Sequence, residues 1–244
     1  MQSSCVPPNP GSRFVTATAE ESAPEGDSTT KAPSWQGRRG EPTRFILLRH
    51  GQTALSVERR YSGRGNPELT DEGRRQARAA AQRVVREDGI TAIVTSPLRR
   101  ARATAEEVGA LTGIDVIEHP GLIENDFGDW EGLTFTEAST RDPELHRTWL
   151  SDITVPAPGG ESFAQVAERI AQTKAELLEE YSGQTVVLVS HVTPIKTLLQ
   201  DALGVGPELL FRLHLDLASV SIAEFFDDGG SVVRLVNDAA HWRD

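Results

Sequence analysis

Residues 44–51, Arg-Phe-Ile-Leu-Leu-Arg-His-Gly, decide the fold, because four consecutive apolar residues lead directly into a polar loop. A second apolar run over 185–189 leads into Ser190 and His191, and a third lies at 90–95. Short continuous apolar runs of this kind are typical of strands that are buried on both faces, as in a parallel sheet. The three runs therefore predict central strands of such a sheet.

Segments with helix signals lie between these strands. Thr70 and Ser96 have the chemistry of N-caps, Pro97 suits a first helical turn, and glycines follow several segments as C-caps do. The alternation of strands and helices predicts an α/β fold, a three-layer sandwich in which helices cover both faces of a mostly parallel central sheet. The expected helices cover 71–88, 97–113, 161–181 and 194–203, with a weaker strand at 114–118, turns and short helices over 122–160, and a hairpin of strands 220–226 and 232–236.

The first 42 residues differ in composition from the rest of the chain. They are rich in Pro, Ser, Thr, Gly and Glu, and Phe14 and Trp35 are their only aromatic residues. Burial of so little apolar surface does not offset the entropy that a chain loses on ordering. We therefore expect 1–42 to be a flexible tail or linker and 43–244 to be the folded domain.

Charge and composition exclude several classes of protein. The 244 residues include 36 acidic and 25 basic side chains, a net charge of −11, and so acidic a surface repels the backbone of nucleic acids. No apolar run approaches the ~18 residues of a membrane span, and the N-terminus lacks the pattern of a secretory signal. The single cysteine, Cys5, forms neither an internal disulfide nor a cysteine metal cluster. We expect a cytoplasmic chain that binds neither nucleic acid nor membranes.

Basic and imidazole side chains follow each of the three predicted strands. Arg49 and His50 follow the first strand, and His191 follows another. Arg99 and Arg100 follow the strand at 90–95, in the first turn of the next helix. Because the carboxyl ends of parallel strands meet at one edge of a sheet, these groups are expected to converge into an anion site that contains a nucleophile. Taken singly, each residue has an ordinary alternative, a hydrogen-bonded loop histidine or a solvated arginine.

Other catalytic patterns are absent from the sequence. No pair of histidines has metal-ligand spacing and no dense acidic cluster accompanies the histidines, so we expect no metal ion. The serine-hydrolase elbow Gly-x-Ser-x-Gly and the complete glycine-rich nucleotide-binding motifs are missing as well. We therefore expect neither a serine triad nor a cofactor.

Five motifs occur in order along the chain, and together they resemble one family. They are Leu47–Thr53 (LLRHGQT), Tyr61–Arg64, Leu69–Gly73, Ser96–Ala101 and Ser190-His191. The chain resembles the histidine phosphatase superfamily, also called phosphoglycerate mutase-like proteins. Within it, residues 49–65 and 190–196 are similar to the C-terminal phosphatase half of mycobacterial bifunctional ribonuclease H/acid phosphatase proteins, a branch related to α-ribazole phosphatases. This resemblance implies that residues 1–42 are the remnant of an interdomain linker.

The resemblance implies a role for each matched residue. His50 matches the nucleophile that forms a phosphohistidine, and Arg49 and Arg100 match the arginines that clamp the phosphate. His191 matches the second histidine, which contacts the phosphoryl oxygens. Glu124 matches the general acid that protonates the leaving group and later activates water. From its sequence context alone, Glu124 is not distinguishable from other surface carboxylates.

Five further residues are expected to bind substrate. Ser62 and Gly63 match the loop at the mouth of the pocket, and Thr53 and Thr193 follow the two histidines closely enough to orient them. Ser56 stands where mutase-type members often carry an asparagine that touches the phosphate, so this contact is the one departure from the family pattern. The aromatic residues of 122–160 are expected to form either pocket walls or core.

These residues favour a cofactor-independent phosphomonoester hydrolase of the acid phosphatase type. Its expected partners are a small phosphorylated metabolite and, from the resemblance, a fused or associated ribonuclease H domain. The first alternative is a phosphoglycerate mutase, which is disfavoured because no proline-rich insertion lies between Glu124 and Gly160. The second is a non-catalytic phosphate-binding regulatory module, which is disfavoured because every matched catalytic position is retained.

Overall fold

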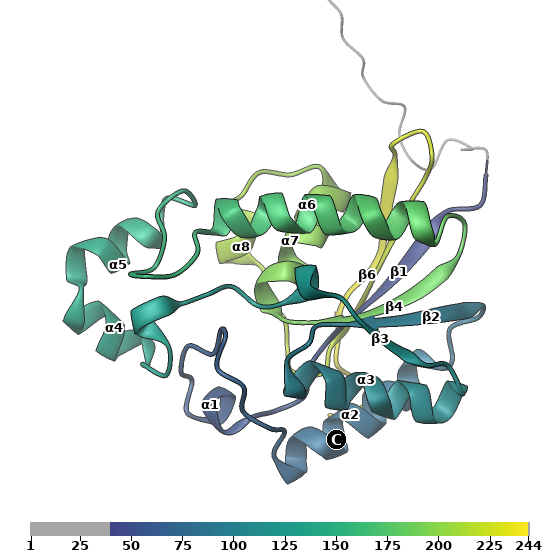
Figure 1. The fold of residues 1–244 in the computed structure, drawn as a ribbon, viewed down its shortest axis with the longest axis horizontal. Coiled ribbons are helices and arrows are strands. Elements are labelled where there is room, and N and C mark those ends of the chain that lie inside the picture. Colours follow the sequence, from purple (N-terminus) through teal and green to yellow (C-terminus); the bar gives the residue numbers. More distant parts are fainter. Residues whose placement is uncertain (1–39, 244) are drawn as a thin grey trace, which may run out of the picture. The chain divides into compact units, whose positions relative to one another are not determined.

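The central sheet follows the order β3-β2-β4-β1-β5-β6 in the computed structural model, which describes residues 40–243 (Figure 1). Four strands are parallel, and β5 and β6 form the antiparallel hairpin that the sequence predicts. The expected tail over 1–42 lies outside the described residues apart from residues 40–42, so it stays a prediction. The strands are β1 (Thr43–Arg49), β2 (Ile90–Thr95), β3 (Val116–Glu118), β4 (Thr185–Ser190), β5 (Val220–Phe225) and β6 (Ser231–Asp238).

Helices cover both faces of the sheet, which confirms the predicted three layers (Figure 1). On β1, Phe45 and Leu47 enter a core shared with α6 and α7, while Ile46 and Leu48 enter a core shared with α2 and α3. This alternation follows from the two-residue period of a strand. The helices are α1 (Ala54–Val57), α2 (Asp71–Val84), α3 (Arg99–Thr112), α4 (Phe135–Arg141), α5 (Pro143–Trp149), α6 (Phe163–Glu180), α7 (Val192–Leu203) and α8 (Leu209–Arg212).

Several expected helix boundaries are wrong, including those of α2 and α3. α2 is capped by Thr70 as predicted but ends at Val84, four residues before the expected end. α3 is not capped by Ser96, because its N-cap is Leu98 and the helix begins only at Arg99. The hydroxyl of Ser96 instead accepts the backbone N–H of Leu98 at 3.3 Å and lies against a buried histidine. A residue that the sequence assigns to a helix cap therefore belongs to the site.

The segment between β3 and α6 forms a separate small core. Here α4 and α5 lie beyond the carboxyl edge of the sheet, on the left of Figure 1. Their apolar residues pack with the beginning of α6 and with α8, around the fully buried Trp130. The indole of Trp130 donates to Asp142 at 2.8 Å, which satisfies its buried N–H. This core builds one side of the site.

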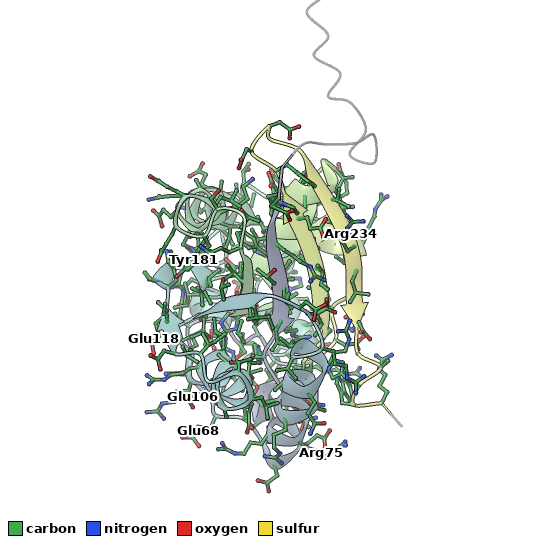
Figure 2. The ribbon with its side chains drawn as sticks, turned by 90° about the vertical axis from the view of Figure 1, so that its right-hand side faces the viewer. Glu68, Arg75, Glu106, Glu118, Tyr181 and Arg234 are labelled. Carbon is green, nitrogen blue, oxygen red and sulfur yellow. The ribbon has the colours of Figure 1, made fainter. Side chains whose placement is uncertain are left out.

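Charged side chains cover the outer faces of the helices. Figure 2 shows Arg75 and Glu106 directed away from α2 and α3, where Arg75 pairs with Glu72 at 2.8 Å and Glu106 pairs with Arg102 at 3.0 Å. Exposed pairs of this kind contribute about 0–1 kcal/mol each, so they tune stability but do not decide the fold. Within residues 40–243, no helix combines the length and apolar character needed to cross a membrane.

Candidate active site

The ends of adjacent strands bring the two predicted histidines together. β1 and β4 are parallel neighbours, and Arg49 at the end of β1 lies opposite Ser190 at the end of β4. The backbone N–H of His50 donates to the carbonyl of Ser190 at 3.1 Å, which extends the strand pairing by one residue. As a result, the ring centroids of His50 and His191 lie 5.0 Å apart, and both side chains are buried.

Two hydrogen bonds fix the imidazole ring of His50. Its Nδ1 lies 2.7 Å from the carbonyl oxygen of Gly51, which can only accept, so Nδ1 carries the proton. The other ring nitrogen, Nε2, accepts from Nε of Arg100 at 3.3 Å. Burial, reinforced by the charges of Arg100 and Arg49, holds the pKa of His50 well below 6.5. The ring is therefore neutral at pH 7, and its unprotonated nitrogen is Nε2, whose lone pair accepts the hydrogen bond from Arg100.

Arg100 is fully buried, and backbone carbonyls hold its guanidinium. The guanidinium Nη atoms donate to the carbonyl oxygens of Ser62, Gly63 and Gly65 at 3.1, 2.9 and 2.8 Å. Burial lowers the pKa of Arg100 from its usual value. Its neighbour Arg99 is exposed. The side chain of Arg100 thus joins the histidine to the loop over residues 62–65.

That loop needs glycine at position 63, because a Cβ atom there would collide with the backbone carbonyl oxygen of Asn125. A Cβ atom at Gly65 would displace the carboxylate of Glu131. Oε2 of Glu131 also accepts the backbone N–H of Gly63 at 2.8 Å. Glu131 therefore fixes the position of the carbonyl oxygens that bind Arg100.

Two buried nitrogen atoms beside the histidine pair have no hydrogen-bond partner among the described residues. They are Nε of Arg49 and Nδ1 of His191. Nη1 of Arg49 donates to the carbonyl of Leu215 at 2.6 Å, and Nε2 of His191 lies 2.7 Å from the hydroxyl of Ser96. Burial lowers the pKa of Arg49 to about 10 and that of His191 well below 6.5. Each unpartnered nitrogen leaves a position at which a ligand atom can complete its hydrogen bonding.

Glu124 is held at the N-terminus of α7. Its Oε2 accepts the backbone N–H of Val192 at 3.0 Å, and its Oε1 accepts those of Thr193 at 3.2 Å and Asn125 at 2.8 Å. The N-terminus of a helix favours a carboxylate through its free N–H groups and its dipole. Glu124 is therefore a buried acid with one fixed orientation toward the histidine pair.

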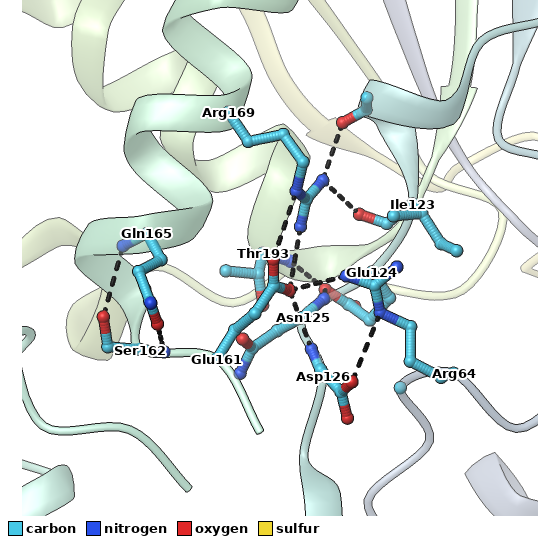
Figure 3. A network of polar contacts seen from close by, with 12 residues as sticks. Arg64, Ile123, Glu124, Asn125, Asp126, Glu161, Ser162, Gln165, Arg169 and Thr193 are labelled. Carbon is cyan, nitrogen blue, oxygen red and sulfur yellow. Dashed lines mark hydrogen bonds and ion pairs between the residues drawn. The ribbon is translucent and has the colours of Figure 1, made fainter. Parts of the chain in front are cut away.

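A network of charged side chains fixes the backbone on both sides of Glu124 (Figure 3). On one side, Nη1 of Arg169 donates to two carbonyl oxygens of residues 121–123, at 2.7 and 2.9 Å. On the other side, Glu161 accepts the backbone N–H of the second residue after Glu124 at 3.1 Å. Glu161 also binds Arg169 at 3.1 Å and Arg64 at 2.8 Å. Because Arg64 belongs to the loop that receives Arg100, the network connects the acid to the buried arginine.

The site opens into a cavity of about 670 Å³. Three predicted site residues, Arg100, His191 and Gly63, are not part of its lining. We refer to the five predicted catalytic groups as the polar floor: Arg49, His50, Arg100, Glu124 and His191. The predicted residues that line the cavity are Arg49, His50, Thr53, Ser56, Ser62, Glu124 and Thr193.

Aromatic rings make up a large part of the remaining lining. Ring centroids lie 6.2 Å apart for Phe127 and Trp149, 4.8 Å for Trp149 and Phe163, and 5.6 Å for Phe163 and Phe211, so these four rings form a continuous surface. Trp130, for which the sequence left wall and core open, is core. We refer to five of the lining rings as the aromatic wall: Phe127, Phe135, Trp149, Phe163 and Phe211.

The two threonines and Ser56 make local contacts. The hydroxyls of Thr53 and Ser56 each accept the other's backbone N–H, at 3.3 and 2.9 Å, and so form the capping box of α1. Thr193 holds Glu124 through its backbone. Within the described residues, neither threonine is hydrogen-bonded to the histidine it was expected to orient, since His50 is oriented by Gly51 and an arginine. Contact of these residues with a substrate stays a prediction.

A model of the histidine phosphatase superfamily, branch 1, matches residues 45–238. The chain belongs to this superfamily. The match spans β1 through β6 and includes every residue of the polar floor, so the resemblance indicated by the five motifs is confirmed. The α/β sandwich expected for the family is confirmed as well.

Relatives of this superfamily member fall into several groups. It is 52% identical over 92% of its length to the Bifunctional protein Rv2228c of Mycobacterium tuberculosis, and it spans 64% of that protein. It is 32% identical to the mycobacterial glucosyl-3-phosphoglycerate phosphatase solved with inorganic phosphate, covering 82% of this chain and 99% of that one, with a TM-score of 0.72. It is 27% identical to the α-ribazole phosphatase of Shigella flexneri, covering 81% and 97%, with a TM-score of 0.73.

Sequence reasoning did not identify several residues of the site. Lys196 and Asp216 line the cavity, Ser96 contacts His191, and Glu131 supports the loop under Arg100. Only Lys196 has a signal in the sequence, since it lies one helical turn after Thr193 on a helix that starts at the site. Within residues 40–243, no group of three or more His, Cys, Asp or Glu side chains has the arrangement of a metal site.

Proposed function

We propose that this chain hydrolyses phosphate monoesters through a phosphohistidine formed on Nε2 of His50. The observation that carries the proposal is the state of His50, a neutral ring that lines the cavity, has Nε2 unprotonated and lies beside the guanidinium groups of Arg49 and Arg100. A neutral imidazole is a nucleophile, and a guanidinium fork matches the oxygens of a phosphoryl group. The phosphatase names of relatives support the same reaction class.

The proposed reaction has two steps. In the first, Nε2 of His50 attacks phosphorus, the P–O bond to the leaving group breaks, and Glu124 donates a proton to the departing oxygen. In the second, Glu124 accepts a proton from water as the water oxygen attacks phosphorus, and the N–P bond breaks to release phosphate. Arg49, Arg100 and His191 stabilise the charge on the non-bridging oxygens in both transition states. No metal ion or cofactor takes part in this scheme.

Hydrolysis of a chromogenic phosphate ester by wild-type protein and His50→Ala tests the proposal. We expect the variant to lose at least about 10³-fold in kcat/KM, because no other group replaces the nucleophile. Mass spectrometry of protein quenched at alkaline pH should detect a phosphoryl group on the peptide that contains His50. Equal rates for the two proteins would overturn the mechanism and favour a non-catalytic phosphate-binding module.

A phosphoglycerate mutase would use the same polar floor and therefore needs a separate test. The mutase reaction keeps the phosphoenzyme and returns the phosphoryl group to a second hydroxyl. With 3-phosphoglycerate and a bisphosphate primer, we expect release of inorganic phosphate to exceed formation of the 2-phospho isomer. The opposite order of rates would identify a mutase.

The acid phosphatase type is part of this proposal. Since the pKa of His50 lies well below 6.5, the nucleophile stays unprotonated in mildly acidic solution. Activity should therefore favour mildly acidic to neutral pH, as the acid phosphatase type requires. A purely alkaline optimum would contradict that type.

The proposed substrate is a small phosphorylated metabolite, and a ribonuclease H domain is the proposed partner. The cavity of about 670 Å³ accommodates a small monoester. The chain spans only 64% of a relative that is named as a bifunctional protein. This partial coverage supports the proposal that the phosphatase domain acts together with a second domain. Co-purification of the native protein with ribonuclease H activity, tested with an RNA–DNA hybrid, would support this partner, and its absence would remove it.

A further inference from the structure

Lys196 is a cation without an anionic partner inside the cavity. It lies on α7 and lines the cavity, and its Nζ donates one hydrogen bond, to the carbonyl of Leu210 at 2.7 Å. Among the described residues no carboxylate lies within ion-pair distance of this ammonium, whereas Lys174, on the outer surface, pairs with Asp201 at 2.6 Å. An ammonium has three donors, so two remain for a ligand.

The surroundings of Lys196 make an unpaired charge costly. Burial lowers its pKa below 10.5, and Arg49 acts in the same direction, while Glu124 opposes them. Much of the rest of the cavity lining is the aromatic wall, where water competes poorly for a charged group. A partly buried cation in such a place is stabilised when a ligand brings an anion to it.

The position of Lys196 relative to Glu124 limits which part of a substrate can reach it. The backbone N–H of Thr193 binds Glu124, and Lys196 follows three residues later on the same face of α7, about 4.5 Å further along the helix axis. Glu124 is the proposed proton donor to the leaving oxygen. The closeness of Lys196 to Glu124 along α7 therefore favours contact of Lys196 with the leaving group.

We propose that Lys196 binds a carboxylate on the leaving group, whose apolar body packs against the aromatic wall. This inference rests on the proposed phosphomonoester hydrolysis and narrows its substrates to monoesters that carry a carboxylate. One ammonium with one donor already used matches a monoanion better than a second phosphate, which calls for several donors.

The other cations of the cavity are less suited to this role. Arg60 is already paired with Glu58 at 2.6 Å and Glu137 at 2.8 Å. His214 is exposed and lies 3.3 Å from Asp216. Arg59 is exposed, so solvent screens its charge. Apart from Arg49, which is assigned to the phosphoryl group, Lys196 is thus the cation of the described lining in which burial and a missing carboxylate partner coincide.

A matched pair of substrates tests the proposal. Each of the three carboxyphenyl phosphate isomers is compared with the methyl ester of its carboxyl group. The ester has nearly the same shape but lacks the carboxylate charge. The ratio of kcat/KM for acid over ester is measured for wild-type protein and for Lys196→Met. Dividing the two ratios cancels the effect of leaving-group acidity, and Lys174→Met is the control that removes the same charge outside the cavity.

We expect the acid-to-ester ratio of at least one isomer to fall at least fivefold in Lys196→Met and to stay unchanged in Lys174→Met. Lys196→Arg should keep more than half of the wild-type ratio, and Lys196→Gln replaces the methionine variant if that protein does not fold. A smaller fall for all three isomers, or an equal fall in Lys174→Met, overturns the role of Lys196. If wild-type protein hydrolyses none of the six esters, the proposed phosphatase function itself fails.

Discussion

The polar floor and the aromatic wall meet at one cavity but are built in different ways. Each side chain of the floor is fixed by hydrogen bonds to backbone groups or to a buried partner, and Arg100 alone binds three carbonyl oxygens. The wall comes from short helices and their connections, and its rings touch only through apolar contacts. A displaced floor residue breaks several hydrogen bonds, whereas a changed wall residue alters only volume and shape.

This difference separates reaction from selectivity. Buried polar groups lose about 1–3 kcal/mol for each partner removed, so the floor tolerates little change. Apolar replacements of similar volume cost less than about 1.5 kcal/mol, so the wall tolerates many. We therefore infer that sequences which keep this floor can differ in substrate through their walls alone. The following predictions challenge that separation, starting with the largest expected effect.

Trp130→Ala should destabilise the small core beneath the aromatic wall and should therefore have the largest effect on stability. The indole is fully buried and binds Asp142, so its removal leaves a large cavity and an unpaired acceptor. We expect a loss of about 3–5 kcal/mol in the free energy of unfolding. Urea denaturation of both proteins at pH 7 measures it. A loss below about 1 kcal/mol would mean that the small core does not support the wall.

Arg100→Lys should show that the floor depends on the geometry of the guanidinium and not on its charge alone. A lysine keeps the positive charge but cannot bind three carbonyl oxygens and a phosphate together. We expect kcat/KM for a chromogenic phosphate ester to fall about 10²–10³-fold. Arg99→Lys, one residue earlier and exposed, is the matched control and should retain wild-type activity. Similar rates for the two variants would contradict the role of Arg100.

Acidic pH should lower the free energy of unfolding through the two histidines of the polar floor, since the aromatic wall contains no group that titrates. His50 and His191 have pKa values well below 6.5 when folded, because burial and the nearby guanidinium groups disfavour their charged forms. Below pH 6.5 the unfolded chain takes up protons that the folded chain does not, so stability falls as pH decreases, by about 1.4 kcal/mol per pH unit for each histidine. Urea titrations between pH 6.5 and 5.5 should show a slope that is one proton smaller in His191→Gln. An unchanged slope would contradict a depressed pKa.

Glu131→Gln and Glu131→Ala should separate two roles of the Glu131 carboxylate, its hydrogen-bond-accepting oxygen and its negative charge. The glutamine keeps an oxygen that can accept the N–H of Gly63, while alanine frees the loop beneath Arg100. We expect kcat to fall about tenfold in Glu131→Ala and much less in Glu131→Gln, because a weakened support misplaces a catalytic group. Equal losses would show that the negative charge, and not the hydrogen bond, is what matters.

Trp149→Phe should have the smallest effect and confirm the tolerance of the wall. Trp149 lines the cavity and packs against Phe127 and Phe163, and phenylalanine keeps an aromatic surface of smaller area. We expect less than a threefold change in kcat for a small ester and a larger change in KM for bulky esters. A large change in kcat for both would show that floor and wall are coupled.

Local patterns in the sequence predicted most of the fold. Continuous apolar runs located β1, β2 and β4, because strands buried on both faces have no polar face to interrupt the run. Helix ends were less accurate, and the assignment of Ser96 as a cap was wrong. That serine is used by His191, which is 95 residues away in the chain, and a distant partner of this kind leaves no local signal.

By itself, the sequence determined which side chains follow the central strands, and therefore that Arg49, His50 and His191 share one edge of the sheet. This shared edge follows from the direction of the strands. An apolar run that is followed by polar residues already shows where each strand ends. Only the tertiary structure decided the protonated nitrogen of His50, the backbone cradle of Glu124 and the division of the aromatic residues between wall and core. These depend on contacts between residues far apart in the chain, and such contacts exist only after the helices and loops have packed around the sheet.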